Sequence, residues 1–90
     1  MRATIEVTRA GDAFDVRVQE GKSETRHHVT LSQDDHARLA PGATPEALIE
    51  AAFRFLLDRE PKESIFARFD VSVISRYFPD FAERLADYLG

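Results

Sequence analysis

The hydrophobic and polar positions along the chain form two regions that meet near residue 31. In residues 2–31, three short runs alternate apolar and polar side chains, as strands with one buried face do. Gly11 and Gly21 separate these runs and can supply the positive φ that tight hairpin turns require. The pattern therefore predicts a three-stranded antiparallel meander that is covered on one face only. Its predicted core positions are Ile5, Val7, Phe14, Val16, Val18, Val29 and Leu31.

The strongest pattern in the chain is the helical periodicity of residues 44–60. Thr44 is a predicted N-cap, Pro45 suits the first helical position, and Pro61 ends the segment because it lacks an amide hydrogen. The apolar arc is wider than a surface helix requires, so this segment is predicted to be the central core helix. The positions that we expect in the core are Leu48, Phe53 and Leu56.

Shorter helices are predicted on both sides of this central helix. The first covers residues 33–40, the next covers 61–69, and a further turn or two lies within 70–78. Residues 71–75 also alternate and are rich in β-branched side chains, so a strand is an open alternative there. A last helix over residues 79–89 carries an apolar stripe. Its predicted core residue is Leu85.

These elements predict one α+β domain over residues 1–90. Residues 1–31 form the meander, and residues 32–90 form four or five helices that pack on one face of the sheet. The composition, with 43% hydrophobic and 31% charged residues, is ordinary for a small globular domain.

Composition and charge narrow the class of protein. The chain has no cysteine, which excludes disulfides and thiolate metal sites. No apolar run is long enough for a membrane span, and the first residues alternate instead of forming the apolar centre of a signal peptide. We therefore expect a soluble cytoplasmic protein. The net charge of −4 disfavours nucleic-acid binding through bulk electrostatics.

No group of residues predicts catalysis. His27 and His28 are neighbours on a predicted strand, so they point to opposite faces and cannot chelate one ion together. The serines lie outside any nucleophile-elbow motif, and the four glycines form no phosphate-binding loop. We expect no catalytic residue, no metal site, no cofactor and no enzymatic activity.

The aromatic residues are concentrated in the helical part of the chain. Eight of the nine lie between Phe53 and Tyr88. Most of them are expected to fill the core. The alternative is that some line a groove for a partner, because short helices separated by prolines bury aromatics incompletely. The sequence therefore predicts a noncatalytic protein-interaction module that binds another chain or a second copy of itself. Its candidate surface consists of Phe66, Phe69, Tyr77 and Phe78.

Residues 26–60 resemble the ribbon-helix-helix family of small bacterial repressors and antitoxins. The similarity rests on a strand that ends at residues 29–32, a short helix with Leu39, and a capped helix with apolar pairs at 48–49 and 55–56. The resemblance implies a dimer whose paired strands lie in the DNA major groove. The residues that would contact DNA are Arg26, His28 and Thr30, with Thr44 near a phosphate.

The chain as a whole, and the run FDVSVISRYFPDF in particular, also resembles small uncharacterised bacterial proteins. This second resemblance implies no particular function.

Overall fold

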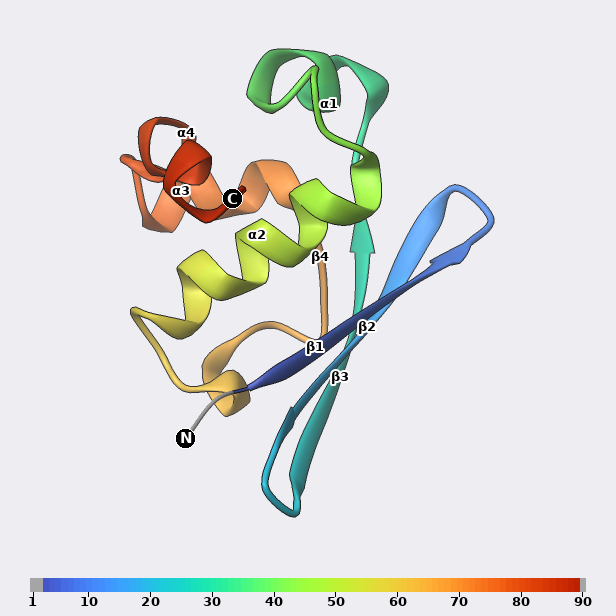
Figure 1. Ribbon diagram of the computed structural model, residues 1–90, viewed down its shortest axis with the longest axis vertical. Coiled ribbons are helices and arrows are strands. Elements are labelled where there is room, and N and C mark those ends of the chain that lie inside the picture. Colours follow the sequence, from blue (N-terminus) through green and yellow to red (C-terminus); the bar gives the residue numbers. More distant parts are fainter. Residues whose placement is uncertain (1–2, 90) are drawn as a thin grey trace.

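The computed structural model describes residues 3–89 and contains a four-stranded sheet with all of its helices on one side (Figure 1). The strands lie in the order β1-β2-β3-β4; the first three are antiparallel, and β4 runs parallel to β3. The strands are β1 (Thr4–Ala10), β2 (Ala13–Glu20), β3 (Ser23–Thr30) and β4 (Arg68–Asp70). The helices are α1 (Gln33–Leu39), α2 (Pro45–Leu57), α3 (Ile74–Tyr77) and α4 (Phe81–Arg84), with single 3₁₀ turns η1 (Lys62–Ser64), η2 (Val71–Val73) and η3 (Leu85–Tyr88).

The predicted meander is present, and its turns use the two expected glycines. Gly11 has φ 64° and Gly21 has φ 60°, and no other described residue has a positive φ. Positive φ at only the first central residue of a two-residue turn is the pattern of a type II′ hairpin. The register pairs Val7 with Val16 and Val16 with His27, so the apolar side chains of all three strands share one face.

The fourth strand was not predicted, and the short helix predicted for residues 61–69 is wrong. That segment forms only the η1 turn and then enters the sheet as β4, where Phe69 pairs with Val29. The backbone N–H of His28 donates to the carbonyl of Ala67 at 2.7 Å and starts this pairing. The sheet is therefore mixed, and the three-stranded meander is only part of it.

Residues 71–75, for which helix and strand were both open, are helical. Asp70 ends β4 and caps the η2 turn, because its carboxylate accepts a hydrogen bond from the Ser72 N–H at 3.0 Å. The alternation extends back to β4, so the segment holds a strand and then a helix, and the two meet at the capping residue.

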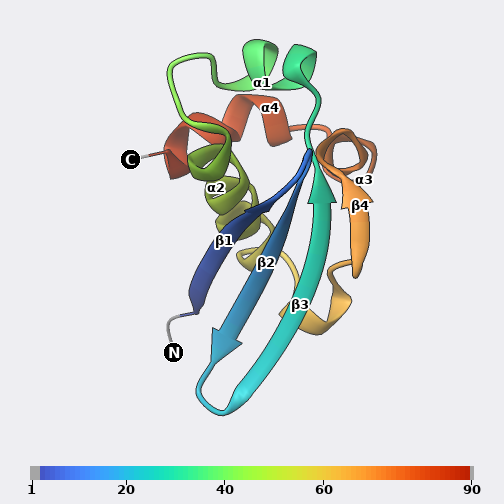
Figure 2. The same ribbon diagram turned by 90° about the vertical axis from the view of Figure 1, so that its right-hand side faces the viewer.

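Helix α2 lies across the inner face of the sheet and forms the centre of the core, whereas the outer face of the sheet is open (Figures 1 and 2). Of the predicted core residues, all are buried except Val7 and Leu31, which are partly buried against the same core. The caps are as predicted: the side chain of Ser32 accepts from the Asp35 N–H, and that of Thr44 accepts from the Ala47 N–H.

Two polar side chains are buried with the core and tie the segment before β4 to the sheet. The His27 ring lies 5.2 Å from that of Phe53, and its Nδ1 is 2.8 Å from the carbonyl oxygen of Phe66. A carbonyl can only accept, so Nδ1 donates to it, and Nε2 forms a second hydrogen bond with the hydroxyl of Thr25 at 2.9 Å. His27 therefore fixes Phe66 through its backbone.

The second is Lys62, whose side chain is only 5% exposed and pairs with Glu63 at 2.7 Å and Glu20 at 3.2 Å. The hydrogen bond to Glu63 holds the pKa of Lys62 above its usual value, against the opposing effect of burial. Because Glu20 ends β2, this ion pair joins η1 to the far end of the meander.

Replacing Phe53 with alanine tests the packing of α2 on the sheet. Phe53 is 0% exposed, and its ring contacts those of His27 and Phe69. We expect Phe53→Ala to lower the free energy of unfolding by about 3–5 kcal/mol, as measured by urea titration followed by circular dichroism. The partly buried neighbour Arg54 forms only an i, i+4 ion pair with Glu50, so Arg54→Ala serves as the control and should change this free energy by about 0.5 kcal/mol or less. A loss below about 1 kcal/mol for Phe53→Ala would contradict this packing.

Candidate protein-binding groove

A hollow of about 250 Å³ opens between the C-terminal end of α2, the segment that leads into β4, and α3. We call it the aromatic groove. It brings together all four residues that the sequence singled out as a candidate surface. Its lining consists of Leu56, Glu60, Ser64, Ile65, Phe66, Phe69, Val73, Ile74, Tyr77 and Phe78.

The four aromatic residues of the groove divide into a rim and a floor. Phe66 is 51% exposed and Tyr77 is 63% exposed, and they are the large hydrophobic residues that the described chain leaves exposed. Their rings meet edge to face, with centroids 5.7 Å apart. Phe69 and Phe78 are partly buried and pack on Phe53 and Phe55 of α2, at 5.9 Å and 5.8 Å. The floor therefore belongs to the core, whereas the rim faces solvent.

Each wall of the groove is set by a different element. On the β4 side, Phe69 points inward because it pairs with the inward residue Val29. On the α3 side, Ile74, Tyr77 and Phe78 follow the i, i+3, i+4 spacing that places side chains on one helical face. This spacing is readable in the sequence. The contributions of Leu56 and Glu60 are not, because they depend on where the end of α2 lies relative to β4.

The junction between the two walls is held by Asp70. Its carboxylate accepts from the Thr30 hydroxyl at 2.5 Å and from the Ser72 N–H at 3.0 Å. Partial burial acts to raise the pKa of Asp70, but the hydrogen bonds from Thr30 and Ser72 outweigh it and lower this pKa below its usual value. The ionised carboxylate therefore stabilises the junction between β3, β4 and η2.

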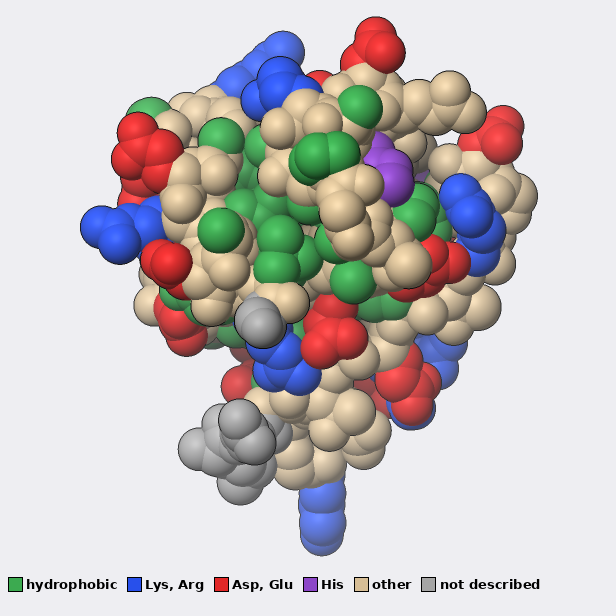
Figure 3. All heavy atoms as spheres, turned by 45° about the horizontal axis from the view of Figure 1, so that its top comes forward, with side chains coloured by type: hydrophobic (Ala, Val, Ile, Leu, Met, Phe, Trp, Pro, Cys, Tyr) green, Lys and Arg blue, Asp and Glu red, His purple; other side chains and the backbone are tan. Residues whose placement is uncertain are grey.

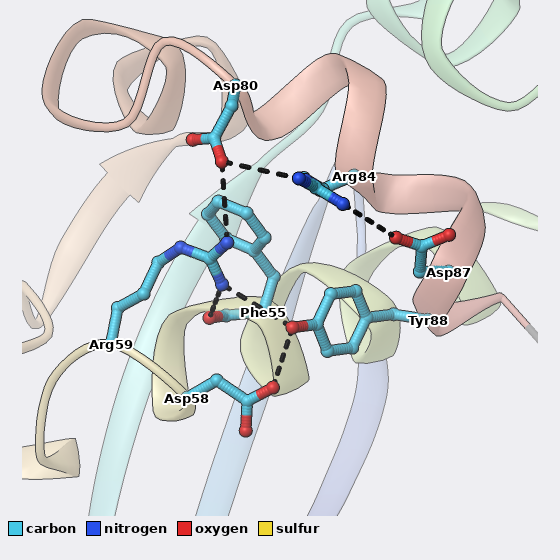
Figure 4. A network of polar contacts seen from close by, with 7 residues as sticks. All are labelled: Phe55, Asp58, Arg59, Asp80, Arg84, Asp87 and Tyr88. Carbon is cyan, nitrogen blue, oxygen red and sulfur yellow. Dashed lines mark hydrogen bonds and ion pairs between the residues drawn. The ribbon is translucent and has the colours of Figure 1, made fainter.

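A polar network clamps the C-terminal segment onto α2 behind the groove (Figure 4). The guanidinium of Arg59 lies 3.6 Å from the centroid of the Phe55 ring and donates to the carbonyl of Phe55 at 3.1 Å. It also donates to the hydroxyl of Tyr88 at 3.4 Å and to Asp80 at 3.5 Å. Tyr88 in turn donates to Asp58 at 2.6 Å. This network supports Phe55, on which the floor of the groove rests.

The residues expected to contact DNA occupy two separate places. Arg26 and His28 lie on the open face of β3, and both are paired with acids: Arg26 with Glu24 at 2.8 Å and His28 with Asp15 at 2.9 Å. Around them the outer face forms a broad, shallow depression of mixed charge.

The other two residues of that set have structural roles. Thr30, at the end of β3, donates its hydroxyl proton to Asp70. Thr44 lies on another element, at the start of α2, where its hydroxyl oxygen accepts from the Ala47 N–H at 3.1 Å. The structure therefore groups Arg26, His28 and Thr30 on one strand and places Thr44 elsewhere.

Hydrophobic side chains also gather on the face that carries α1, the start of α2 and the C-terminal segment (Figure 3). In these elements Leu39, Ala43 and Leu89 are partly buried and pack against the core. None is among the large hydrophobic residues that are exposed in the described chain. We therefore read this patch as the outer layer of the core, which leaves the aromatic groove as the stronger candidate.

Within residues 3–89, no three histidine, aspartate or glutamate side chains come together in an arrangement that could hold a metal ion. The helices in this part of the chain are also too short or too polar to cross a membrane. The fold and the groove define a small α+β domain with a mixed four-stranded sheet and an apolar groove at the β4 edge. Comparisons of the chain with protein-family models, with curated proteins and with solved structures found no match.

The Asp70 junction predicts a specific pH dependence of stability. Because folding lowers the pKa of Asp70, its contribution is present at neutral pH and is lost as the pH falls below about 4. We expect Asp70→Asn to be less stable than the wild type near neutral pH. The difference should shrink in acid, where the wild-type carboxylate also becomes neutral. Urea titrations at several pH values measure it.

The matched control for this experiment is Asp12→Asn. Asp12 lies in the first hairpin turn, and no side-chain hydrogen bond or ion pair of the described residues involves it. Its curve of stability against pH should follow that of the wild type. The assignment of Asp70 is wrong if its variant and the wild type keep a constant difference throughout the acid range.

Proposed function

We propose that this protein is a noncatalytic protein-interaction module, and that the aromatic groove receives an apolar segment of a partner protein. The observation that carries the proposal is the exposed Phe66–Tyr77 pair at the rim of the hollow. Aromatic residues next to a pocket are the side chains that most often dominate the energy of protein interfaces.

The size and lining of the groove support a protein partner. A hollow of about 250 Å³ is smaller than the roughly 300–1,000 Å³ typical of small-molecule sites. It suits one or two side chains that project from a larger surface. Apart from the hydroxyl of Tyr77, only Glu60 and Ser64 contribute polar side-chain groups to the lining, so few groups are present to orient a reacting substrate. Burying one aromatic ring at the rim would contribute about 1.5–3 kcal/mol.

The second hypothesis is a DNA-binding regulator of the ribbon-helix-helix type. That mode needs a strand that pairs with its copy in a dimer. In this fold β3 has β2 on one side and β4 on the other over residues 28–30. A second copy could pair with this stretch only by displacing β4. The acidic partners of Arg26 and His28 also compete with phosphate. These observations favour the groove as the working surface.

Selection from a random peptide library, displayed on phage, tests the proposed function. The wild-type protein should enrich peptides with apolar side chains. The double variant Phe66→Ser/Tyr77→Ser should lose that enrichment and keep a melting temperature close to that of the wild type, because both rings are more than half exposed. The control, Arg26→Ala on the open sheet face, should enrich the same peptides as the wild type.

Two outcomes would count against the groove. Absence of any enriched apolar peptide with the folded wild type would remove the proposal. Peptides that bind the wild type and the Phe66→Ser/Tyr77→Ser variant equally well would place the binding surface elsewhere. If Arg26→Ala instead abolished a salt-dependent affinity for duplex DNA, the ribbon-helix-helix hypothesis would replace it.

A further inference from the structure

Two arginines that are close in sequence to the rim residues of the aromatic groove form no ion pair. Among the described residues, most basic side chains form ion pairs, but Arg68 and Arg76 form none, and both are exposed. Arg68 follows the rim residue Phe66 by two positions, and Arg76 immediately precedes the rim residue Tyr77. These two positive charges, one in β4 and one in α3, are unneutralised in a chain whose net charge is −4.

The backbone at the same place is an open sheet edge. Strand β4 pairs only with β3 and is the last strand of the sheet (Figure 2). The N–H of His28 donates to the carbonyl of Ala67, and the register pairs His28 with Arg68. Because backbone groups of successive residues in a strand point to opposite sides, the N–H and C=O of Arg68 point away from β3. They are free to pair with an added strand.

The side chains of β4 alternate between the groove side and the open side of the sheet. Phe69 pairs with the inward residue Val29 and lies on the groove side of the sheet. Arg68 pairs with His28 and lies on the open side. A strand added beside β4 would therefore present alternate side chains to an apolar hollow and to a positive charge.

From this geometry we infer that the partner segment is an extended strand of alternating apolar and acidic residues that pairs with the free edge of β4. Its apolar side chains enter the aromatic groove, and its carboxylates lie on the open side of the sheet, where they face Arg68. This inference rests on the proposed function and adds the conformation and charge of the partner. Arg68 supplies both a main-chain contact and a charge, so it sets which residues are accepted opposite it.

The probe for this inference is a synthetic peptide, acetyl-Ser-Phe-Asp-Phe-Asp-Val-Ser-amide, and its matched control has lysine in place of both aspartates. Binding is measured by isothermal titration calorimetry at low salt, and the site by amide chemical shifts of residues 64–78. We expect the acidic peptide to bind at least about fivefold more tightly than its lysine counterpart, since each exposed ion pair contributes modestly. N-methylation removes the amide hydrogens through which the peptide would pair with β4. Methylating one of the two sets of alternate peptide residues should therefore abolish binding, and methylating the other set should not.

Charge reversal on the protein completes the test. Arg68→Glu should remove the preference for the acidic peptide, because it replaces the positive charge that faces the carboxylates. The control is Lys22→Glu, because Lys22 is an exposed basic residue in the second hairpin turn that also lacks an ion pair. It should leave the preference unchanged.

The possible failures are distinguishable from failure of the groove itself. If both peptides bind equally and Tyr77→Ser weakens both, the acidic partner is excluded and the groove remains. If N-methylation of neither set of alternate peptide residues affects binding, strand addition to β4 is excluded. If library selection succeeds but neither synthetic peptide binds, the inference is overturned and the proposed function still stands.

Discussion

The pairing of β4 with β3 is the contact on which the rest of this structure depends. Three residues, Arg68–Asp70, bring the chain back from the end of α2 to the sheet and then release it into η2 and α3. Without that return, Phe66 and Phe69 would have no fixed position relative to Tyr77 and Phe78, and the aromatic groove would not form. A strand of three residues contributes few hydrogen bonds of its own. Its position must therefore come from what surrounds it.

Polar contacts, of which those of His27 and Lys62 are buried, supply that position. His27 holds the carbonyl of Phe66, Lys62 holds η1 to Glu20, and Asp70 joins Thr30 to Ser72. Each of these three residues makes a contact with a residue far away in the sequence: His27 with Phe66, Lys62 with Glu20, and Asp70 with Thr30. In an apolar interior an unpaired polar group is costly, so the buried His27 and Lys62 admit few alternative placements of their partners. No buried side-chain nitrogen or oxygen among the described residues lacks a hydrogen bond. The main effect of these groups is to restrict the returning segment to a single position, and their contribution to stability is the smaller effect.

The parts of the fold that could be predicted are those whose cause is local in the sequence. Alternation with Gly11 and Gly21 was enough for the first three strands, and the caps at Ser32 and Thr44 were enough for the first two helices. Strand β4 has no such local signal. Its alternation covers only three residues, and its hydrogen bonds are made with a strand about 40 positions earlier. The same limit applies to the groove. Its four aromatics could be selected by spacing and composition, but Leu56 and Glu60 join them only through tertiary packing.

Within the aromatic groove, residues that the core requires lie next to residues that it does not require. Its floor residues, Phe69 and Phe78, rest on Phe53 and Phe55, so evolution could not change them without weakening the core. Its rim residues, Phe66 and Tyr77, make one ring contact with each other and leave more than half of their surface in water. Polar residues at these two positions would lower the cost of exposed apolar surface and leave the core intact. Folding alone therefore gives no reason to keep a large apolar side chain at either rim position. A partner that covers the rim is the simplest physical reason for both to be aromatic.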